Sequence, residues 1–251
     1  MSEQRGNGQA SRGVLVGVGV GPGDPELITL KAMRALHEAD LVVHFAKSGA
    51  ASHARAIAAD HLRVGVEELP LHYPMTREVP RETCTYRDAL RDFYDAAASR
   101  LAAHLDAGRK VAVICEGDPL FYGSYMHLHV RLAPRYQTHV IAGVTGMSGC
   151  WSAAGAPIAQ GDDVLMVLPA TLPETEIEHR LKEADAAVVM KLGSHLPKIR
   201  RVLTRLGRME RAIYVERGSA KDATMMRLAD KGDDAAPYFA IVLVPGWEKR
   251  A

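Results

Sequence analysis

Short apolar runs alternate with segments of helical periodicity along the first half of the chain. The run "VLVGVG" at 14–19 precedes a helical pattern over about 25–39, and "DLVVHF" at 40–45 precedes a second one around 51–61. A longer helical stretch, 82–107, ends at Gly108 and leads into "KVAVICEG" at 110–117. Strands that alternate with helices are typical of βαβ units. The pattern therefore predicts an α/β domain built on a parallel sheet.

The second half differs in character, because its apolar runs are longer and more widely separated. They read "DVLMVLP", "DAAVVMKLG" and "FAIVLVPG", and they follow a helix predicted over 118–134 and a strand at "THVIAG". The prolines of "VEELPLHYPMTREVPRE" at 66–82 predict a break in regular structure. We therefore expect a disordered tail at 1–12, a first α/β domain at 13–137 and a second at 138–251.

The composition and the net charge of the chain argue against several classes of binding partner. The chain has 251 residues, of which 47% are hydrophobic, enough for a substantial core. Its net charge of +1, from 31 basic and 30 acidic residues, provides no overall field for nucleic acid or for an anionic membrane. No apolar run is long enough to span a bilayer. Three cysteines without paired spacing favour a cytoplasmic protein with free thiols.

Three glycine-bearing turns each follow an apolar run: "GVGVGPGDP" at 17–25, "CEGDPLFYG" at 115–123 and "AGVTGMSG" at 142–149. Ligands of open α/β sheets bind at the carboxyl ends of the strands, so the three turns indicate one shared cleft. The first turn does not fit a dinucleotide fingerprint, because Pro22 stands where the pattern needs glycine. Asp24 also places negative charge where a pyrophosphate would dock.

These motifs, in this order, resemble the tetrapyrrole methylase family, which transfers methyl groups from S-adenosylmethionine to corrin and sirohaem precursors. The motifs are "GVGVGPGDPELITLKAMRAL", "EGDPLFYGS" and "AGVTGMSGCWSAAGAPI", followed by "MKLGSHLPKIRRVL" and "YVERGS". Within the family, "LHYPMT" and "MKLG" are most similar to the branch that methylates C-20 of precorrin-2 in cobalamin biosynthesis. A related branch acts on the cobalt-loaded macrocycle, and the sequence leaves that alternative open.

The resemblance implies two α/β domains with the active-site cleft between them, a homodimer, and S-adenosylmethionine as methyl donor. It further implies that the first glycine turn lies on the tetrapyrrole side. The family's cofactor turn usually reads G-G-D-P, whereas this chain has Glu116 at the first position. The cofactor residues that it implies are Gly117, Asp118, Phe121, Tyr122, Thr145, Gly146, Lys191, Leu192 and Ala240.

A macrocycle with many carboxylates requires basic side chains on its side of the cleft. The substrate-binding candidates are Pro22, Gly23 and Asp24 of the first turn, together with Lys47, Arg77 and Arg81. Methyl transfer from a sulfonium needs orientation more than acid–base chemistry, so a base has only to remove the displaced proton. Tyr73, Glu116 and Tyr122 are the candidates for that base.

No metal site is expected, because the histidines of "HLHV" at 127–130 have i, i+2 spacing in a helix and point to different faces. Two other functions stay open on the residues alone. One is a nucleotide-dependent oxidoreductase, which binding of a nicotinamide cofactor would reveal. The other is a regulatory module that binds S-adenosylmethionine without turnover of a tetrapyrrole.

Overall fold

The computed structural model of the chain describes residues 12–74 and 84–246. The chain divides after Val144 into two compact units. The boundary lies later than the expected position after Gln137, because the strand that begins there pairs with the first strand of the chain and so completes the first sheet. Each unit has its own sheet and its own hydrophobic cores.

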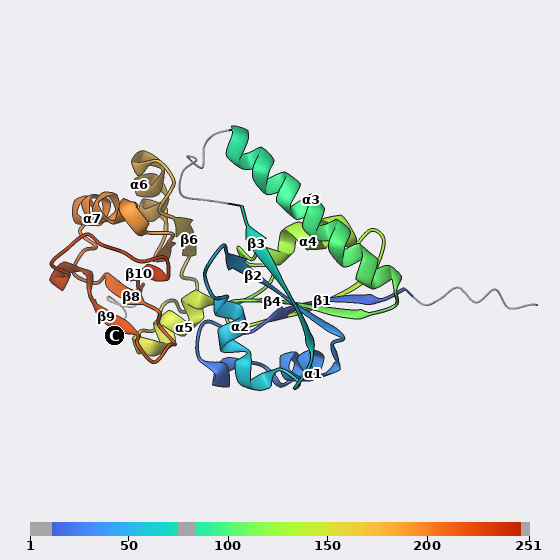
Figure 1. The fold of residues 1–251 in the computed structure, drawn as a ribbon. Helices are drawn as coiled ribbons and strands as arrows, with labels where there is room; N and C mark the ends of the chain where they lie inside the picture. Colours follow the sequence, from blue (N-terminus) through green and yellow to red (C-terminus); the bar gives the residue numbers. More distant parts are fainter. Residues whose placement is uncertain (1–11, 75–83, 247–251) are drawn as a thin grey trace, which may run out of the picture. The chain divides into compact units, whose positions relative to one another are not determined.

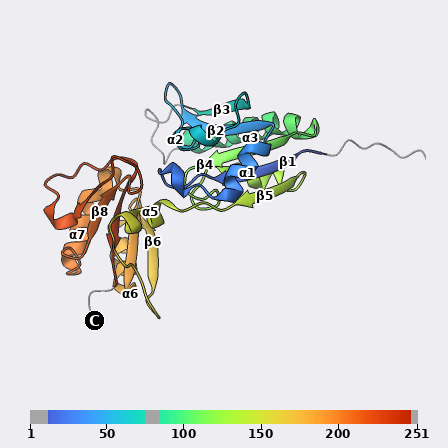
Figure 2. The ribbon, with the colours of Figure 1, turned by 90° about the horizontal axis from the view of Figure 1, so that it is seen from below.

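The first unit is built on a five-stranded sheet of order β3-β2-β4-β1-β5, in which every pair of neighbours is parallel. Figures 1 and 2 show this sheet with its helices from two directions. Its elements are β1 (Val14–Gly19), η1 (Pro25–Leu27), α1 (Leu30–Glu38), β2 (Leu41–Lys47), α2 (His53–Ile57), η2 (Ala59–His61), β3 (Glu67–Tyr73), α3 (Cys84–Asp106), β4 (Lys110–Cys115), α4 (Tyr125–Leu132) and β5 (Gln137–Ile141). The βαβ pattern read from the sequence is confirmed.

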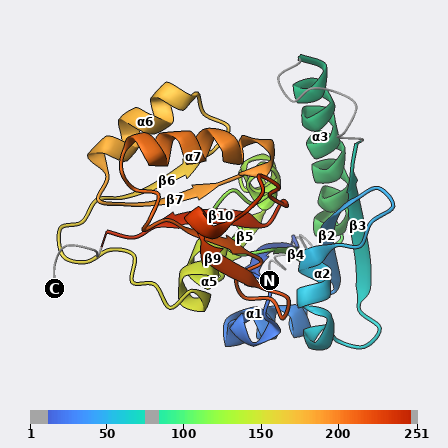
Figure 3. The same cartoon turned by 90° about the vertical axis from the view of Figure 1, so that its left-hand side faces the viewer.

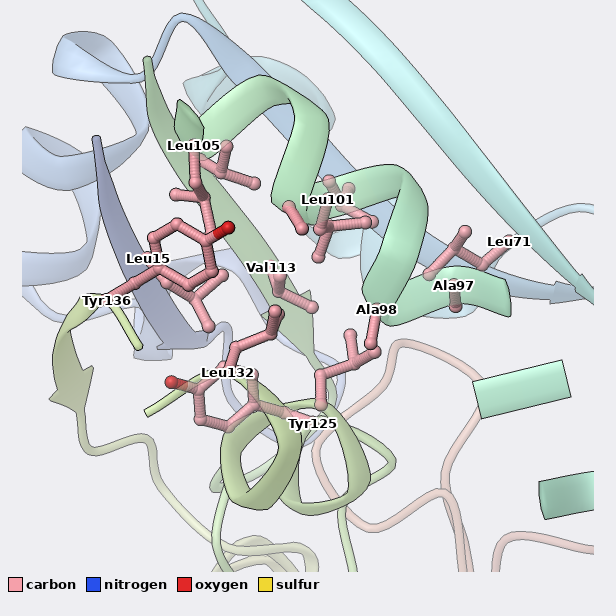
Figure 4. Packing of buried hydrophobic residues seen from close by; sticks show 14 of the residues in the cluster. Leu15, Leu71, Ala97, Ala98, Leu101, Leu105, Val113, Tyr125, Leu132 and Tyr136 are labelled. Carbon is pink, nitrogen blue, oxygen red and sulfur yellow. The ribbon is translucent and has the colours of Figure 1, made fainter. Parts of the chain in front are cut away.

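Helices cover both faces of this sheet, so its central strands β2, β4 and β1 are largely buried on both sides. On one face α3 and α4 pack on a core that includes Leu15, Val113 and Leu101 (Figure 4). On the other face α1 and α2 pack on a second core that includes Val18 and Ile114. Burial on both faces explains why the strands read as nearly continuous apolar runs. Neighbouring residues of one strand therefore reach different cores.

Two local expectations for this unit were wrong. The first was the start of the predicted break in regular structure over 66–82, because β3 runs through Pro70 and ends only at Tyr73. The later part of that break, from residue 75 on, lies outside the described residues. Strand β3 pairs only with β2 and lies at the edge of the sheet, where the missing amide hydrogen of proline costs no ladder bond. The second was the helix over 118–134, which begins only at Tyr125 and leaves 116–124 as a loop.

The second unit has a mixed sheet of order β6-β7-β10-β8-β9, in which only β6 and β7 are parallel (Figure 3). One core lies between this sheet and the helices α6 and α7, and another lies between the sheet and α5. The elements are α5 (Gly146–Ala153), β6 (Leu165–Pro169), α6 (Glu174–Glu183), β7 (Ala186–Met190), η3 (Gly193–His195), α7 (Leu196–Arg205), β8 (Ile213–Glu216), β9 (Thr224–Arg227), η4 (Leu228–Asp230) and β10 (Ala240–Val244).

The helices of the two units are those of a globular α/β protein. Among residues 12–74 and 84–246, no helix combines the length and the apolar composition needed to cross a bilayer.

Candidate functional site

The three glycine-bearing turns leave three adjacent strands, β4, β1 and β5, at their carboxyl ends. Two hydrogen bonds join the turns within the first unit. The amide of Gly117 donates to the carbonyl of Gly21 at 2.7 Å, and the amide of Gly143 donates to Oδ2 of Asp118 at 3.1 Å. The first two turns and the start of the third, at Gly143, are therefore joined to one another.

The backbones of these turns approach more closely than any side chain would allow. A Cβ atom on Gly19 would lie 2.6 Å from the carbonyl oxygen of Gly117, and one on Gly143 would lie 2.1 Å from the same oxygen. Real Cβ atoms do not come this close to backbone atoms, so the glycines are a steric requirement here. The requirement belongs to the fold, because it exists without any ligand.

The loop from β4 to α4, residues 116–124, is folded around Asp118. Oδ1 of Asp118 accepts a hydrogen bond from the amide of Leu120 at 2.9 Å, while its Oδ2 holds Gly143. The tip of the loop carries apolar surface, since the side chains of Leu120 and Tyr122 are each 48% exposed. Tyr122 adopts a left-handed φ of 55°, and its ring meets Phe121 edge-on at 5.0 Å. Such strain at an exposed aromatic residue is typical of binding loops.

The loop is anchored at its far end by the first residue of α4. The backbone of Tyr125 hydrogen-bonds to the buried thiol of Cys115, the last residue of β4. Burial raises the pKa of Cys115 to about 12, so the group stays a thiol. The ring of Tyr125 fills the space beside Gly17, where a Cβ atom would lie 2.5 Å from it.

Glu116, the first residue of the loop, lies on the α2 side of the sheet, whereas Cys115 lies in the core under α3 and α4. Its carboxylate accepts a hydrogen bond from the backbone of Ala54 at the start of α2. Burial nevertheless dominates and raises the pKa of Glu116 to about 7. The group can therefore take up or release a proton near neutral pH.

Tyr73, the last residue of β3, lies on the face that α3 and α4 cover. Its hydroxyl group is hydrogen-bonded to Oγ of Ser124, the last residue of the loop. Burial, together with neighbouring Tyr94, raises the pKa of Tyr73 well above that of an ordinary tyrosine. A phenol in this environment keeps its proton at neutral pH, so Tyr73 can donate a hydrogen bond.

A second group of candidate residues lies at one end of the sheet in the second unit. Val242 pairs with Val189 in the antiparallel β10–β7 ladder, which places Ala240 at the end where β7 gives way to Lys191. Leu192 and Ala240 are buried, while the backbone of Lys191 is left-handed, with φ of 58°.

Two features lie beside these candidates. The amide of Arg217 donates to the carbonyl of Phe239, next to Ala240, at 2.9 Å, and Arg217 is also left-handed, with φ of 47°. In the same unit Thr145 caps α5, since its Oγ1 accepts a hydrogen bond from the amide of Ser148 at 3.3 Å. A Cβ atom on Gly146 would meet no protein atom within 4 Å.

Known proteins resemble this chain both in sequence and in fold. The family model of the Tetrapyrrole (Corrin/Porphyrin) Methylases matches residues 14–230. The chain belongs to the tetrapyrrole methylase family. It is 57% identical over 238 residues to the precorrin-2 C(20)-methyltransferase of a Sinorhizobium species, a match that spans 95% of this chain and 97% of that protein. It is 47% identical to the cobalamin biosynthesis protein CobIJ of Mycobacterium bovis over 96% of this chain, which is 48% of that longer protein.

Solved structures of other methyltransferases share the fold of this family member. The cobalt precorrin-4 methyltransferase CbiF matches with a TM-score of 0.69 at 21% identity, over 93% of this chain and 95% of that one. The uroporphyrin-III C-methyltransferase of Thermus thermophilus, solved with S-adenosylhomocysteine, matches with a TM-score of 0.63 at 23% identity, over 92% and 97%. The two-unit α/β architecture expected from the sequence is thus that of the family, and the oxidoreductase alternative is set aside.

The structure brings the expected residues together in two sets, one in each unit. The first unit contains Glu116, Gly117, Asp118, Phe121 and Tyr122 in one loop, with Pro22, Gly23 and Asp24 in the neighbouring turn and Tyr73 and Lys47 at the ends of paired strands. The second unit contains Thr145 and Gly146 at the start of α5, with Lys191, Leu192 and Ala240 at one end of the sheet. The expected substrate-binding residues Arg77 and Arg81 lie outside the described residues.

Three details modify the roles expected of these residues. The carboxylate of Asp118 is used in holding the loop, and that of Asp24 accepts the amide of Glu26 at 2.9 Å, where it caps η1. Phe121 and Tyr122 belong to the loop and not to a helix. Among the described residues, no group of three or more histidine, cysteine or carboxylate side chains has a metal-binding arrangement.

Sequence reasoning missed Arg217 and Gly218, although it used the segment "YVERGS" that contains them. A Cβ atom on Gly218 would lie 2.6 Å from Cα of Cys150, so this glycine lets the chain after β8 pass close to α5. The adjacent left-handed arginine had no sequence signal, because φ above zero is not expected of a residue other than glycine, asparagine or aspartate.

A pair of glycine substitutions separates the steric requirement from ligand binding. We expect Gly143→Ala to lower the melting temperature by several degrees, because its methyl group would overlap the carbonyl of Gly117. Gly146→Ala is the matched control, since its methyl group enters open space and helix propensity improves. Calorimetric melting of both variants measures the difference, and equal melting temperatures would contradict the close packing of the turns.

The buried carboxyl group of Glu116 should make stability depend on pH. Between its ordinary pKa of 4.5 and about 7, the folded chain holds a proton that the unfolded chain has lost. The free energy of unfolding therefore falls as pH rises through this window. Glu116→Gln should remove that fall and stabilise the protein more at about pH 8 than at about pH 5, by at most about 3 kcal/mol.

Urea unfolding at the two pH values measures this effect of Glu116. The control is Glu26→Gln, which removes an exposed carboxylate. If the stability difference between wild type and Glu116→Gln is the same at both pH values, the prediction is wrong. The carboxyl group of Glu116 then titrates as an exposed carboxyl group does.

Proposed function

We propose that this chain transfers the methyl group of S-adenosylmethionine to the C-20 meso carbon of precorrin-2 in cobalamin biosynthesis. The observation that carries the proposal is the 57% identity to a precorrin-2 C(20)-methyltransferase over nearly the whole of both chains. The cobalt-precorrin-2 C(20)-methyltransferase of Salmonella typhimurium is 29% identical over 94% of this chain. The identities therefore favour the metal-free macrocycle as the substrate.

The candidate residues fit S-adenosylmethionine chemically. This molecule has a sulfonium cation, an amino-acid end and an adenine ring, and it carries no phosphate. The glycines of the turns expose backbone groups, the loop tip provides apolar and aromatic surface, and Gly146 leaves open space beside its backbone. We propose that the loops of both units contribute to its binding, with Leu192 and Ala240 at the adenosine.

The chain's own residues then have few chemical tasks. When bound, S-adenosylmethionine supplies a methyl group on a leaving group that needs no further activation. The protein has to orient the macrocycle, exclude water and accept the proton that leaves C-20. Of the three expected bases, Glu116 fits the last task best, because its pKa of about 7 lets it receive a proton near neutral pH.

We also propose that the enzyme is a homodimer that works in the cytoplasm and holds the carboxylates of its substrate with Lys47, Arg77 and Arg81. The free, buried thiols of Cys115 and Cys150 support a reducing compartment. Lys47 supports the substrate side, since it is exposed at the carboxyl end of β2 next to Tyr73.

An assay with two substrates tests the reaction. We expect the purified chain to convert precorrin-2 with S-adenosylmethionine into a product in which one methyl group replaces one hydrogen, with release of S-adenosylhomocysteine. Mass and absorbance spectra measure the product, with the cobalt-loaded macrocycle as the parallel substrate. Turnover of the cobalt form alone would move the chain to the related reaction, and cofactor binding without any turnover would favour a regulatory module.

Gly146→Val should weaken binding of S-adenosylmethionine at least tenfold, because a branched side chain would fill space that the protein itself leaves open. Gly232→Val is the matched control, since a Cβ atom there also meets no atom within 4 Å and the residue belongs to no candidate loop. Calorimetric titration gives both dissociation constants. Unchanged affinity in a folded Gly146→Val variant would remove this residue from the site.

A further inference from the structure

Ser124 stands at the N-cap of α4 but does not cap the helix. In three other helices a serine or threonine at this position accepts a backbone hydrogen bond: Thr29 in α1, Ser52 in α2 and Thr145 in α5. The side chain of Ser124 makes no such bond. A capping bond contributes about 1 kcal/mol to helix stability. The backbone of Ser124 is in the αR region, with φ of −65° and ψ of −22°, whereas the three capping residues are extended. Its hydroxyl group is therefore not placed to cap α4 and is available to another partner.

That hydroxyl group is bonded to Tyr73 at the end of β3. Tyr94 of α3 joins the same cluster, because its side chain hydrogen-bonds with both Tyr73 and Ser124. Three hydroxyl groups from β3, α3 and the β4–α4 loop thus meet in a partly buried cluster. We call these three residues the hydroxyl cluster.

The two aromatic members of the hydroxyl cluster have fixed rings. The ring of Tyr73 stacks on Phe45 of β2 at 5.6 Å and lies 5.3 Å from Phe93. The ring of Tyr94 stacks on His127 of α4 at 4.2 Å. Packing on several sides leaves the hydroxyl of Tyr73 little freedom, so it forms a fixed point for Ser124.

The hydroxyl cluster completes the attachment of the loop 116–124. The beginning of the loop is tied to the other two turns by Gly117 and Asp118. Its end is tied to β3 through the hydrogen bond between Ser124 and Tyr73. Between the two ties lies the tip with Phe121 and the left-handed Tyr122. The geometry of the tip therefore depends on both attachments.

We infer that Tyr73 is a positioning residue: its bond to Ser124 holds the tip of the β4–α4 loop in the conformation that binds S-adenosylmethionine. The inference rests on the proposed function. Without the tyrosine hydroxyl, Ser124 loses its hydrogen bond to the end of β3, and the loop gains alternative conformations. The apparent dissociation constant of a ligand rises by the factor by which its binding-competent conformation is depleted.

Tyr73→Phe tests this role, because it removes one oxygen atom and keeps the packed ring. We expect the dissociation constant for S-adenosylmethionine to rise about three- to tenfold, as expected for the loss of one buried hydrogen bond. The turnover number at saturating S-adenosylmethionine should change little, because the bound ligand keeps the loop in its binding-competent conformation. Hydrogen exchange at the amides of 120–124, measured without ligand, should become faster.

The matched control is Tyr136→Phe. Tyr136 is buried in the same core, and its hydroxyl donates to Oδ1 of Asp106 at 2.9 Å, at the other edge of the sheet. The Tyr136→Phe variant should lower the melting temperature about as much as Tyr73→Phe does. Its affinity for S-adenosylmethionine and the hydrogen exchange of the loop 116–124 should stay at wild-type values. Ser124→Ala should weaken binding as Tyr73→Phe does, and the double variant should be no weaker than either single one.

The outcomes separate this inference from the proposed function. Wild-type affinity and loop exchange in Tyr73→Phe would overturn the positioning role, and so would an equal effect of Tyr136→Phe on binding. A wild-type chain that binds no S-adenosylmethionine would overturn the proposed function, and the exchange measurement would then still report whether Tyr73 holds the loop.

Discussion

The contact between the backbones of Gly143 and Gly117 is the constraint on which the rest of the first unit's candidate site depends. It brings the turns after β4 and β5 within van der Waals distance, and Gly19 brings the turn after β1 to the same place. Hydrogen bonds through Gly21 and Asp118 then fix the arrangement. A parallel sheet delivers three adjacent strand ends to one edge, but only residues without a Cβ atom let the turns touch there.

The two residues at the end of β4 show how strand geometry assigns chemistry. Cys115 ends β4 and Glu116 begins the loop, and their side chains lie on opposite sides of the sheet. The thiol lies under α3 and α4 in an apolar core, which keeps it protonated and inert. The carboxyl group lies toward α2, where one backbone hydrogen bond only partly offsets the cost of burial. One face therefore anchors the loop, and the other carries a group that titrates near neutral pH.

The tyrosine at the end of β3 has a role that the reaction alone would not suggest. An expectation based on residue type made Tyr73 a base, whereas its buried surroundings keep the phenol protonated. The same burial strengthens its value as a fixed hydrogen-bonding partner, because a bond in an apolar setting has little competition from water. The hydrogen bond between Tyr73 and Ser124 joins the end of β3 to the end of the β4–α4 loop.

The sequence by itself determined the βαβ order, the three glycine turns and the family, because these depend on periodicity and on residues whose steric properties are local. It also located the second set of candidates through "MKLG". Only the tertiary structure decided the rest. Pro70 fits into β3 because that strand is an edge, and the first unit ends after Val144 because β5 pairs with β1. Ser124 bonds to Tyr73 because the fold brings the end of the β4–α4 loop beside the end of β3. Pairing and burial join residues that are distant in the chain, so no local pattern of residues records them.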